Sequence, residues 1–410
     1  MRRCTNQWGE SMERYWKRNL YMLWLGLFFN HMAFTLSVPF FPLFLHNDLG
    51  VQSGLEAWSG FSISISFLIS GLCAPFWGSL ADKFGKKPML IRSGIGLGLA
   101  HLANYFVYDL CTFLLVRVFQ GLMAGFSPAS IALVGTNTPE KHVGYALGVI
   151  STSTAAGGIL GPLAGGLMSQ WIGLRGCFIA SGLITLFSAM IVMAGVIEVR
   201  ERQAGTRPSV LDDLKQAAVN TRLMRIYGLI LLVSTSAMIL EPLLAIYVVE
   251  LGGSINHALL SSGIVFSAVG IATVIMGPRW GRIGGRIGYE KTLFIGLLGG
   301  GIGNILQLGV HHLVGFGILR FSYGLFFAAV YPALNALIIK YADDEFRGRA
   351  VSLSQTASQF GIVIGPLAGG ILGGWIGIQF VFLLTGLTLI GAAWTIKAIF
   401  SKQPDRTLTG

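Results

Sequence analysis

Three fully charged side chains lie well inside long apolar stretches of this sequence: Arg117, Glu241 and Arg320. A charge at the centre of a membrane-spanning helix costs about 2.5–3.5 kcal/mol on insertion scales, so such residues usually pair or serve transport. A carboxyl group can bind and release a proton, and Pro242 after Glu241 favours a bend that widens a cavity. We therefore expect Glu241 to carry protons and Arg117 and Arg320 to act in coupling or gating. A structural ion pair between Glu241 and Arg320 is the alternative.

The apolar stretches around these charges predict an all-α polytopic membrane protein. Of the 410 residues, 53% are hydrophobic and 11% are charged, whereas a soluble domain has about 25% charged residues. A membrane-spanning helix needs about 20 mostly apolar residues. Twelve stretches meet this need: 20–45, 58–80, 88–107, 111–135, 143–168, 176–197, 226–250, 260–282, 291–310, 313–340, 349–372 and 379–400.

The net charge of +11 indicates how the chain is oriented in the membrane and does not indicate nucleic-acid binding. Nearly all of the 29 Lys and Arg residues lie near the N-terminus, in the C-terminal tail, or in and beside the loops that follow the even-numbered spans. Arg175 is the exception, because it falls on the opposite side. This asymmetry predicts a plasma or inner membrane protein with both termini in the cytoplasm.

The chain contains two copies of one six-span unit. GGILGPLAGG at 157–166 recurs as GIVIGPLAGG at 361–370, and GSLADKFGKK from Gly78 is matched by GRIGGRIGYEK from Gly281. Arg117 matches Arg320 at the same offset of about 203 residues. An even number of spans per copy predicts a parallel repeat. The predicted domains are an N-terminal segment (1–19), a first bundle (20–197), a cytoplasmic linker (198–225), a second bundle (226–400) and a cytoplasmic tail (401–410).

Glycines four residues apart lie on one face of a helix. Helices in lipid associate through close packing at small residues, and a proline inside a helix removes a hydrogen bond and bends it. We therefore expect tightly packed, kinked helices at both copies of the pattern. Simple packing is one interpretation, and a contact that slides between conformations is the other. The residues concerned are Gly157, Gly161, Pro162 and Gly165 in the first copy, and Gly365 and Pro366 in the second.

These motifs together resemble the major facilitator superfamily, and among its members the twelve-span drug/proton antiporters. Gly78, Asp82 and Gly85 match its loop signature between spans 2 and 3, and Arg117-Val-Phe-Gln120-Gly121 matches its span-4 pattern. The glycine-proline pattern at 157–166 matches the span-5 pattern associated with antiporters. The second copy departs from the loop signature, because Gly285 stands in the place of Asp82.

The resemblance implies two pseudo-symmetric six-helix bundles in which spans 1, 4, 7 and 10 line a central cavity. It makes Asp82 a charge latch that holds the cytoplasmic side closed in one state. Weaker candidates for substrate contact on spans 1 and 7 are His31, Phe34, Pro39 and Tyr247.

The predicted function is proton-coupled antiport by alternating access, in a monomer. The expected substrates are lipophilic drugs or metabolites, including cationic ones, and multidrug resistance is the expected phenotype. No cofactor, metal or nucleic acid is expected, and the sequence lacks the nucleophile, base and oxyanion constellation of an enzyme. A proton/solute symporter of the same fold, importing a small organic solute, is the alternative.

Overall fold

The computed structural model describes residues 2–198, 220–252, 255–343 and 346–400, and these contain helices and turns but no strand. The elements are α1 (Arg2–Ser37), η1 (Val38–Phe40), α2 (Phe41–Asn47), α3 (Leu55–Phe84), α4 (Lys86–Ala103), η2 (Asn104–Phe106), α5 (Leu110–Met123), α6 (Phe126–Asn137), η3 (Glu140–His142), α7 (Val143–Gly195), α9 (Thr221–Met238), α10 (Leu244–Glu250), α11 (Ile255–Ile287), α12 (Tyr289–Leu306), η4 (Gln307–Gly309), α13 (Leu313–Phe327), α14 (Val330–Tyr341), α15 (Arg347–Ile376) and α16 (Ile378–Phe400).

Each of the twelve predicted spans coincides with helical structure. Nine helical segments of the described chain are long and apolar enough to cross a membrane. One of them, α7, has 53 residues and joins two predicted spans at Gly173, whose backbone is not helical (φ 68°, ψ 175°). The remaining two spans correspond to α4 and to α9 with α10, which are shorter and more polar. Most of the predicted linker and the predicted tail lie outside the described residues.

Four of the predicted spans are interrupted part-way, and of these breaks only the bend at Pro242 was predicted. They occur in span 1 at η1, in span 4 at Ala124–Gly125, in span 7 at residues 239–243 and in span 10 at residues 328–329. Pro39 lacks an N–H group, and Gly125 has a φ of 126° that other residues rarely adopt. Within a bilayer, such breaks are tolerated where protein or a water-filled cavity satisfies the backbone.

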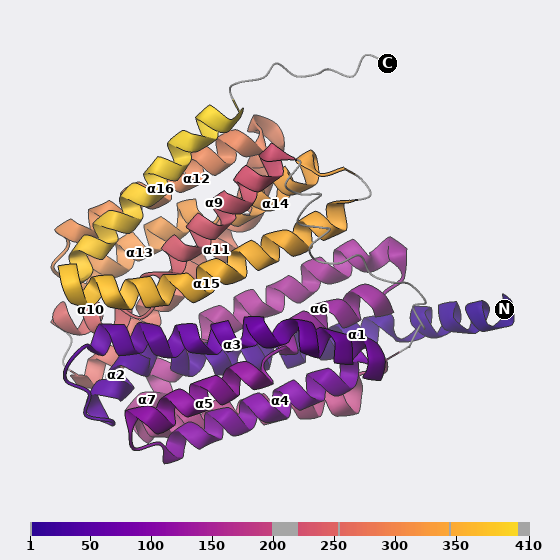
Figure 1. Ribbon diagram of the computed structural model, residues 1–410, viewed down its shortest axis with the longest axis horizontal. Helices are drawn as coiled ribbons and strands as arrows, with labels where there is room; N and C mark the ends of the chain where they lie inside the picture. The colour runs from indigo at the N-terminus through magenta and orange to yellow at the C-terminus, as the bar shows by residue number, and fades with distance from the viewer. Residues whose placement is uncertain (1, 199–219, 253–254, 344–345, 401–410) are drawn as a thin grey trace. The chain divides into compact units, whose positions relative to one another are not determined.

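The chain forms two compact units. Unit 1 comprises Met1–Gly205 and Leu244–Ser267, and unit 2 comprises Thr206–Leu243 and Ala268–Gly410. In unit 1, α1 packs along α7, α7 packs against α4, and α3 packs against α5 (Figure 1). In unit 2, α15 packs against α9, and α12 packs against both α16 and α13 (Figure 1). Span 1 thus pairs with span 5 as span 7 pairs with span 11. The division into two six-span bundles stays a prediction.

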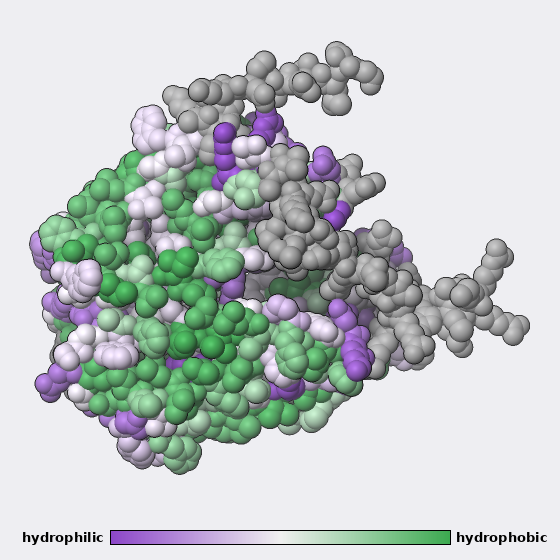
Figure 2. Space-filling model, viewed as in Figure 1, coloured by the Kyte–Doolittle hydropathy of each residue, from purple (hydrophilic) through white to green (hydrophobic). Residues whose placement is uncertain are grey.

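Much of the molecular surface is apolar. Figure 2 shows hydrophobic side chains over most of the coloured part of one face. Trp171 is 85% exposed and Trp375, its equivalent in the second copy, is 83% exposed. Exposed apolar area of this extent suits contact with lipid.

The glycine face of α7 lies directly against α1. A Cβ atom added at Gly157 would lie 2.8 Å from the backbone nitrogen of Met32 and 2.9 Å from the carbonyl oxygen of Phe28. Added Cβ atoms at Gly161 and Gly165 would also collide with α1. The predicted tight packing in the first copy is therefore packing of backbone on backbone.

The second copy repeats this packing in the same register. A Cβ atom at Gly361 would lie 2.8 Å from both the carbonyl oxygen of Leu231 and the backbone nitrogen of Thr235. These two residues follow Phe28 and Met32 by 203 positions. Gly365 and Gly369 abut α9 in the same way. The internal repeat read from the sequence is thus also a repeat of contacts.

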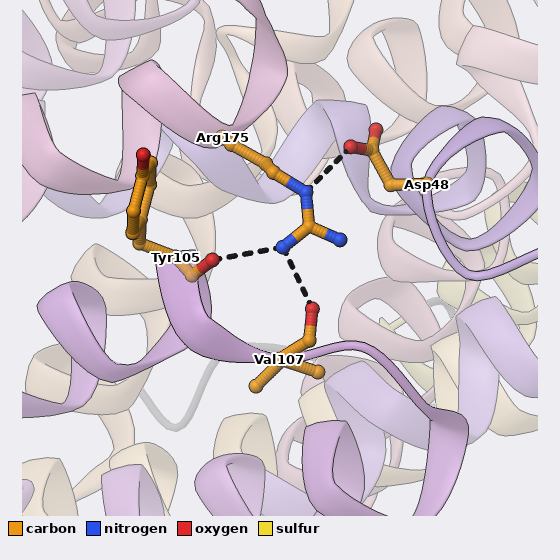
Figure 3. Close-up of polar contacts among 4 residues, drawn as sticks. All are labelled: Asp48, Tyr105, Val107 and Arg175. Carbon is orange, nitrogen blue, oxygen red and sulfur yellow. Dashed lines mark hydrogen bonds and ion pairs between the residues drawn. The ribbon is translucent and has the colours of Figure 1, made fainter.

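Arg175, the basic residue on the predicted outer side, joins three segments of unit 1 (Figure 3). Its Nε donates to Asp48 Oδ1 at 2.9 Å, and its Nη1 donates to the carbonyl oxygens of Tyr105 and Val107 at 2.8 Å. The guanidinium carbon also lies 4.5 Å from the ring centroid of Tyr108. This one side chain on α7 connects Asp48, directly after α2, with η2 and the residue that follows it.

Replacing Gly157 with Ala should destabilise the protein, because the new methyl group meets backbone atoms that cannot move aside. Overpacking of this kind costs about 1–3 kcal/mol, so we expect a lower melting temperature in detergent. Gly148→Ala, on the same helix with nothing within 4 Å of the new atom, is the matched control and should not lower it. Equal melting temperatures for the two variants would contradict the packing assignment.

Arg175→Lys should also destabilise the protein, since a lysine cannot reproduce the planar set of donors. Leaving a partly buried acceptor unsatisfied costs about 1–3 kcal/mol. Arg279→Lys is the control, because Arg279 is exposed and donates only to Ile275 within its own helix. Thermal unfolding followed by intrinsic tryptophan fluorescence measures the difference, and an Arg175→Lys protein as stable as the control would refute the clamp.

Candidate functional site

Arg117 lies on α5 in the interior of unit 1, with 1% of its surface exposed. Its guanidinium carbon is 4.6 Å from the ring centroid of Phe41 and 5.1 Å from that of Phe113. Its Nε and Nη2 atoms have no hydrogen-bond partner in the described part of the chain. The aromatic rings stabilise the cation, but no described carboxylate neutralises it, so Arg117 is a buried charge with unused donors.

His101 and Gln120 form a second buried polar group on the neighbouring turn. Gln120, one turn after Arg117, places its Nε2 3.4 Å from Nε2 of His101 on α4, and both side chains are less than 5% exposed. His101 Nδ1 and Gln120 Oε1 lack partners among the described residues. Sequence reasoning named His31 on span 1 but missed His101. A titratable residue in an otherwise apolar stretch was the available signal.

The second copy pairs some of the equivalent groups with one another. Asn304 stands 203 residues after His101, and its Nδ2 donates to Thr385 Oγ1 at 3.3 Å. Gln307 stands 203 residues after Asn104 and donates to Asn304 Oδ1 at 3.2 Å. The side-chain oxygens of Asn104 and of Gln307 both lack a partner among the described residues. Unsatisfied buried polar groups are sites for bound water or for a functional role, and among the described residues most of them lie in the first copy.

Glu241 and Arg320 both belong to unit 2. Glu241 lies half-buried in the turn between α9 and α10, and Arg320 is 7% exposed on α13. The two charges are near enough to interact electrostatically, but they make no ion pair within 4.0 Å. The guanidinium carbon of Arg320 lies 5.1 Å from the ring centroid of Tyr323 instead. The alternative of a direct structural pair is thus absent from this conformation.

Gly121 sets the position of the helix that carries Arg117. A Cβ atom there would lie 2.5 Å from the carbonyl oxygen of Ser66 and 2.8 Å from Cβ of Ile69 on α3. Ser66 Oγ in turn donates to the carbonyl oxygen of Arg117 at 2.9 Å. Gly324 brings α13 against α11 in the same manner. The span-4 motif therefore combines one buried charge with the small residue that lets its helix approach the next.

The motif in the loop between spans 2 and 3 contains one glycine that the backbone requires and one that it does not. Gly85 is the single residue between α3 and α4, and its φ of 102° favours glycine, as does the φ of 93° at Gly288. Gly78 is exposed and would tolerate a Cβ atom, since nothing lies within 4 Å. Asp82 is exposed near the end of α3. The structure thus gives a backbone reason for Gly85 but not for Gly78.

Glu198 places its carboxylate at the N-terminus of α4, and the latch role of Asp82 stays a prediction. Its Oε1 accepts from the backbone N–H of Lys86 at 2.7 Å, and its Oε2 accepts from that of Lys87 at 3.1 Å. Lys87 Nζ donates to the carbonyl oxygen of Val196 at 2.7 Å. A negative charge at a helix N-terminus is favourable. Sequence reasoning assigned Glu198 to the linker and missed this role. An acidic residue in an otherwise basic segment was the feature that could have pointed to it.

The other side of the span-5 motif packs against the start of α11, within unit 1. A Cβ atom at Gly166 would lie 2.8 Å from the carbonyl oxygen of Leu259, and one at Gly263 would collide with the carbonyl oxygen of Pro162. Ser267 Oγ donates to the carbonyl oxygen of Ile159 at 2.6 Å. The motif therefore meets backbone on two sides. A sliding role for this contact stays a prediction.

The candidates for substrate contact divide by burial. His31 and Phe34 are half-buried on α1, with ring centroids 6.2 Å apart, and Phe34 lies 6.0 Å from Phe67. Pro39 is buried in η1, and Tyr247, on α10, is 1% exposed. Since η1 and α10 contact each other, Pro39 and Tyr247 fit a packing role in this conformation. His31 and Phe34 keep the exposure that contact with a ligand requires.

The repeated helical units and their isolated interior charges define a membrane transport protein. The chain belongs to the Major Facilitator Superfamily, whose model matches residues 23–303 and 226–409. It is 35% identical over 403 residues to the multidrug resistance protein MdtG of Klebsiella pneumoniae (strain 342), covering 95% of this chain and 97% of the relative. It is also 35% identical to MdtG of Escherichia coli O17:K52:H18 (strain UMN026 / ExPEC), over 94% of this chain and 95% of that protein.

Solved structures support the same fold. A bacterial homolog of the human lysosomal transporter Spinster, inward-facing and unoccupied, superposes with a TM-score of 0.77 at 15% identity, covering 96% of this chain and 99% of that one. The predicted fold and the predicted resemblance to multidrug efflux transporters of this superfamily are therefore confirmed. The chain is a multi-pass membrane transporter rather than an enzyme.

Proposed function

We propose that this protein is a proton-coupled antiporter that exports lipophilic molecules, cationic ones among them, by alternating access. It works as a monomer in the plasma or inner membrane, with both termini in the cytoplasm. Protons enter as the substrate leaves, and the proton gradient supplies the driving force. The relatives named for multidrug resistance support export.

The observation that carries the proposal is the coincidence of broken spans with ionisable side chains. The four interrupted spans are 1, 4, 7 and 10, and each carries an interior ionisable residue: His31, Arg117, Glu241 and Arg320. Span 3, which is not among them, also carries one, His101, and this residue contacts Gln120 of span 4. Interrupted backbone and intramembrane charge are both tolerated beside a hydrated cavity and both disfavoured beside lipid. On this ground we assign each of the four spans a part in the transport pathway.

Exchange follows because Arg117 stays charged while the carboxyl group of Glu241 can gain and lose a proton. Arg117 is enclosed by aromatic rings and remains a fixed cation. Glu241 is half-buried and makes no ion pair within 4.0 Å with any residue that the structure describes, so its carboxylate can bind either a proton or a cationic substrate. Competition for one carboxylate couples proton entry to substrate exit.

Reconstitution in liposomes tests the proposal. With a pH gradient imposed, the protein should move tetraphenylphosphonium against the direction of proton flow, and nigericin should abolish the movement by collapsing the gradient. Transport that survives collapse would refute proton coupling. Transport of substrate in the same direction as protons would instead favour the symporter.

Arg117→Ala should reduce gradient-driven transport at least about tenfold, because loss of a fixed charge worth about 1.4 kcal/mol or more in the coupled step has that effect. Arg279→Ala, which removes an exposed arginine from α11, should keep near-normal transport. Both variants are compared at equal amounts of inserted protein. Full activity in Arg117→Ala would reject the role assigned to Arg117.

Glu241→Gln should flatten the dependence of transport on pH, since glutamine cannot release a proton. Glu56→Gln is the matched control, because Glu56 is also a half-buried carboxylate but lies in the first turn of α3. The measurement is the initial transport rate between about pH 5.5 and pH 8.5. Carboxyl groups whose proton affinity is raised in a protein titrate in this range. An unchanged profile in Glu241→Gln would reject the proton-carrier proposal.

A further inference from the structure

Unit 2 contains a cavity of about 110 Å³ between α9, α14 and α15. Five of its seven lining residues are polar, although all three helices belong to predicted membrane spans. The lining residues are Ile230, Tyr331, Leu334, Asn335, Ser354, Gln355 and Ser358. Polar side chains within spans face protein or a hydrated cavity rather than lipid.

The hydroxyl groups of this cavity are already engaged. Ser234 Oγ, beside the cavity, lies 3.3 Å from Tyr331 Oη and 3.0 Å from Ser358 Oγ. Ser354 Oγ donates to the carbonyl oxygen of Val351 at 2.7 Å. These bonds hold one side of the cavity in place.

The two amides of the cavity are not engaged. Asn335 and Gln355 are exposed, and neither makes a hydrogen bond to any residue in the described ranges. Each amide has two donors and an acceptor oxygen. Two side chains that line the same cavity therefore offer unused donors and acceptors within the helices of unit 2.

The first copy of the repeat indicates that the fold does not require these amides. In the register set by Pro128 and Pro332, Asn335 corresponds to Ile131 and Gln355 to Ser151. Ser151 satisfies itself by donating to the carbonyl oxygen of Gly148 at 2.7 Å. The same scaffold thus forms with an apolar residue at one position and a short, internally bonded side chain at the other.

The chemistry of the lining selects the kind of group that fits. No Asp, Glu, Lys, Arg or His lines the cavity, so a charged group would lose its hydration without gaining a counter-charge. A neutral hydroxyl or amide would instead find both donors and acceptors. A cavity of about 150 Å³ holds benzene, so this smaller one accommodates part of a drug-sized molecule.

We infer that this cavity binds a neutral hydroxyl or amide group of the transported molecule, with Asn335 and Gln355 as specificity-determining residues. The inference rests on the proposed export function and refines its substrate class. Lipophilic molecules with an uncharged hydrogen-bonding end should be exported in preference to those that lack one.

Asn335→Leu and Gln355→Met test the inference, because each keeps the side-chain size and removes the amide. Efflux from proteoliposomes is measured for two probes. Chloramphenicol is neutral and carries an amide and two hydroxyl groups, and tetraphenylphosphonium has no hydrogen-bonding group. One net hydrogen bond corresponds to roughly a fivefold change in affinity, so each variant should lower the ratio of chloramphenicol to tetraphenylphosphonium efflux about fivefold.

Gln359→Met is the matched control, since it removes the same amide from α15 at a position that does not line the cavity, and it should keep the wild-type ratio. An unchanged ratio in both cavity variants would overturn the inference, as would wild-type protein that exports tetraphenylphosphonium but not chloramphenicol. Wild-type protein that exports neither probe would overturn the proposed function itself.

Discussion

Close contact between helix backbones is the constraint on which this structure depends. Apolar side chains give little reason for helices to associate in lipid, because the surrounding lipid is equally apolar. The glycine faces of α7 and α15 replace that missing force by letting the carbonyl and N–H groups of α1 and α9 come within contact distance. Gly121 and Gly324 do the same for the helices that carry the interior arginines. Small residues therefore hold the polar ones in place.

The two copies share this packing but differ in their polar groups. Among the described residues, His101 Nδ1 and Gln120 Oε1 lack partners in the first copy. In the second copy the side-chain nitrogens of Asn304 and Gln307 both donate hydrogen bonds, although Gln307 Oε1 lacks a partner. At another position the second copy has the polar side chain that makes no hydrogen bond to the described residues. Asn335 on α14 presents an amide where the first copy has Ile131. A common scaffold thus carries different chemistry in each copy, which suits a transporter that must handle a proton and a substrate.

Hydropathy and the repeat were sufficient to predict the spans and the fold, because length and apolarity are what a bilayer requires of a helix. The breaks within spans were harder. Pro39 and Pro242 lie in two of them. Pro128 and Pro332 lie in the first turns of the helices that follow the other two. A proline alone does not mark a break, however, because other prolines, such as Pro162 and Pro366, lie inside helices that continue unbroken through them. The partners of side chains could not be predicted either. Glu198 reaches the start of α4 from a position 112 residues away from Lys86, and no local pattern records that distance.

The turns at Gly85 and Gly288 restrict how the protein can be altered. Each is the single residue between two long helices, so α3 is joined to α4, and α11 to α12, with no slack. A hinge of one residue transmits the movement of one helix directly to the next. It also leaves no room for an inserted tag or a protease site, so these two hairpins resist the insertions that longer surface loops usually accept.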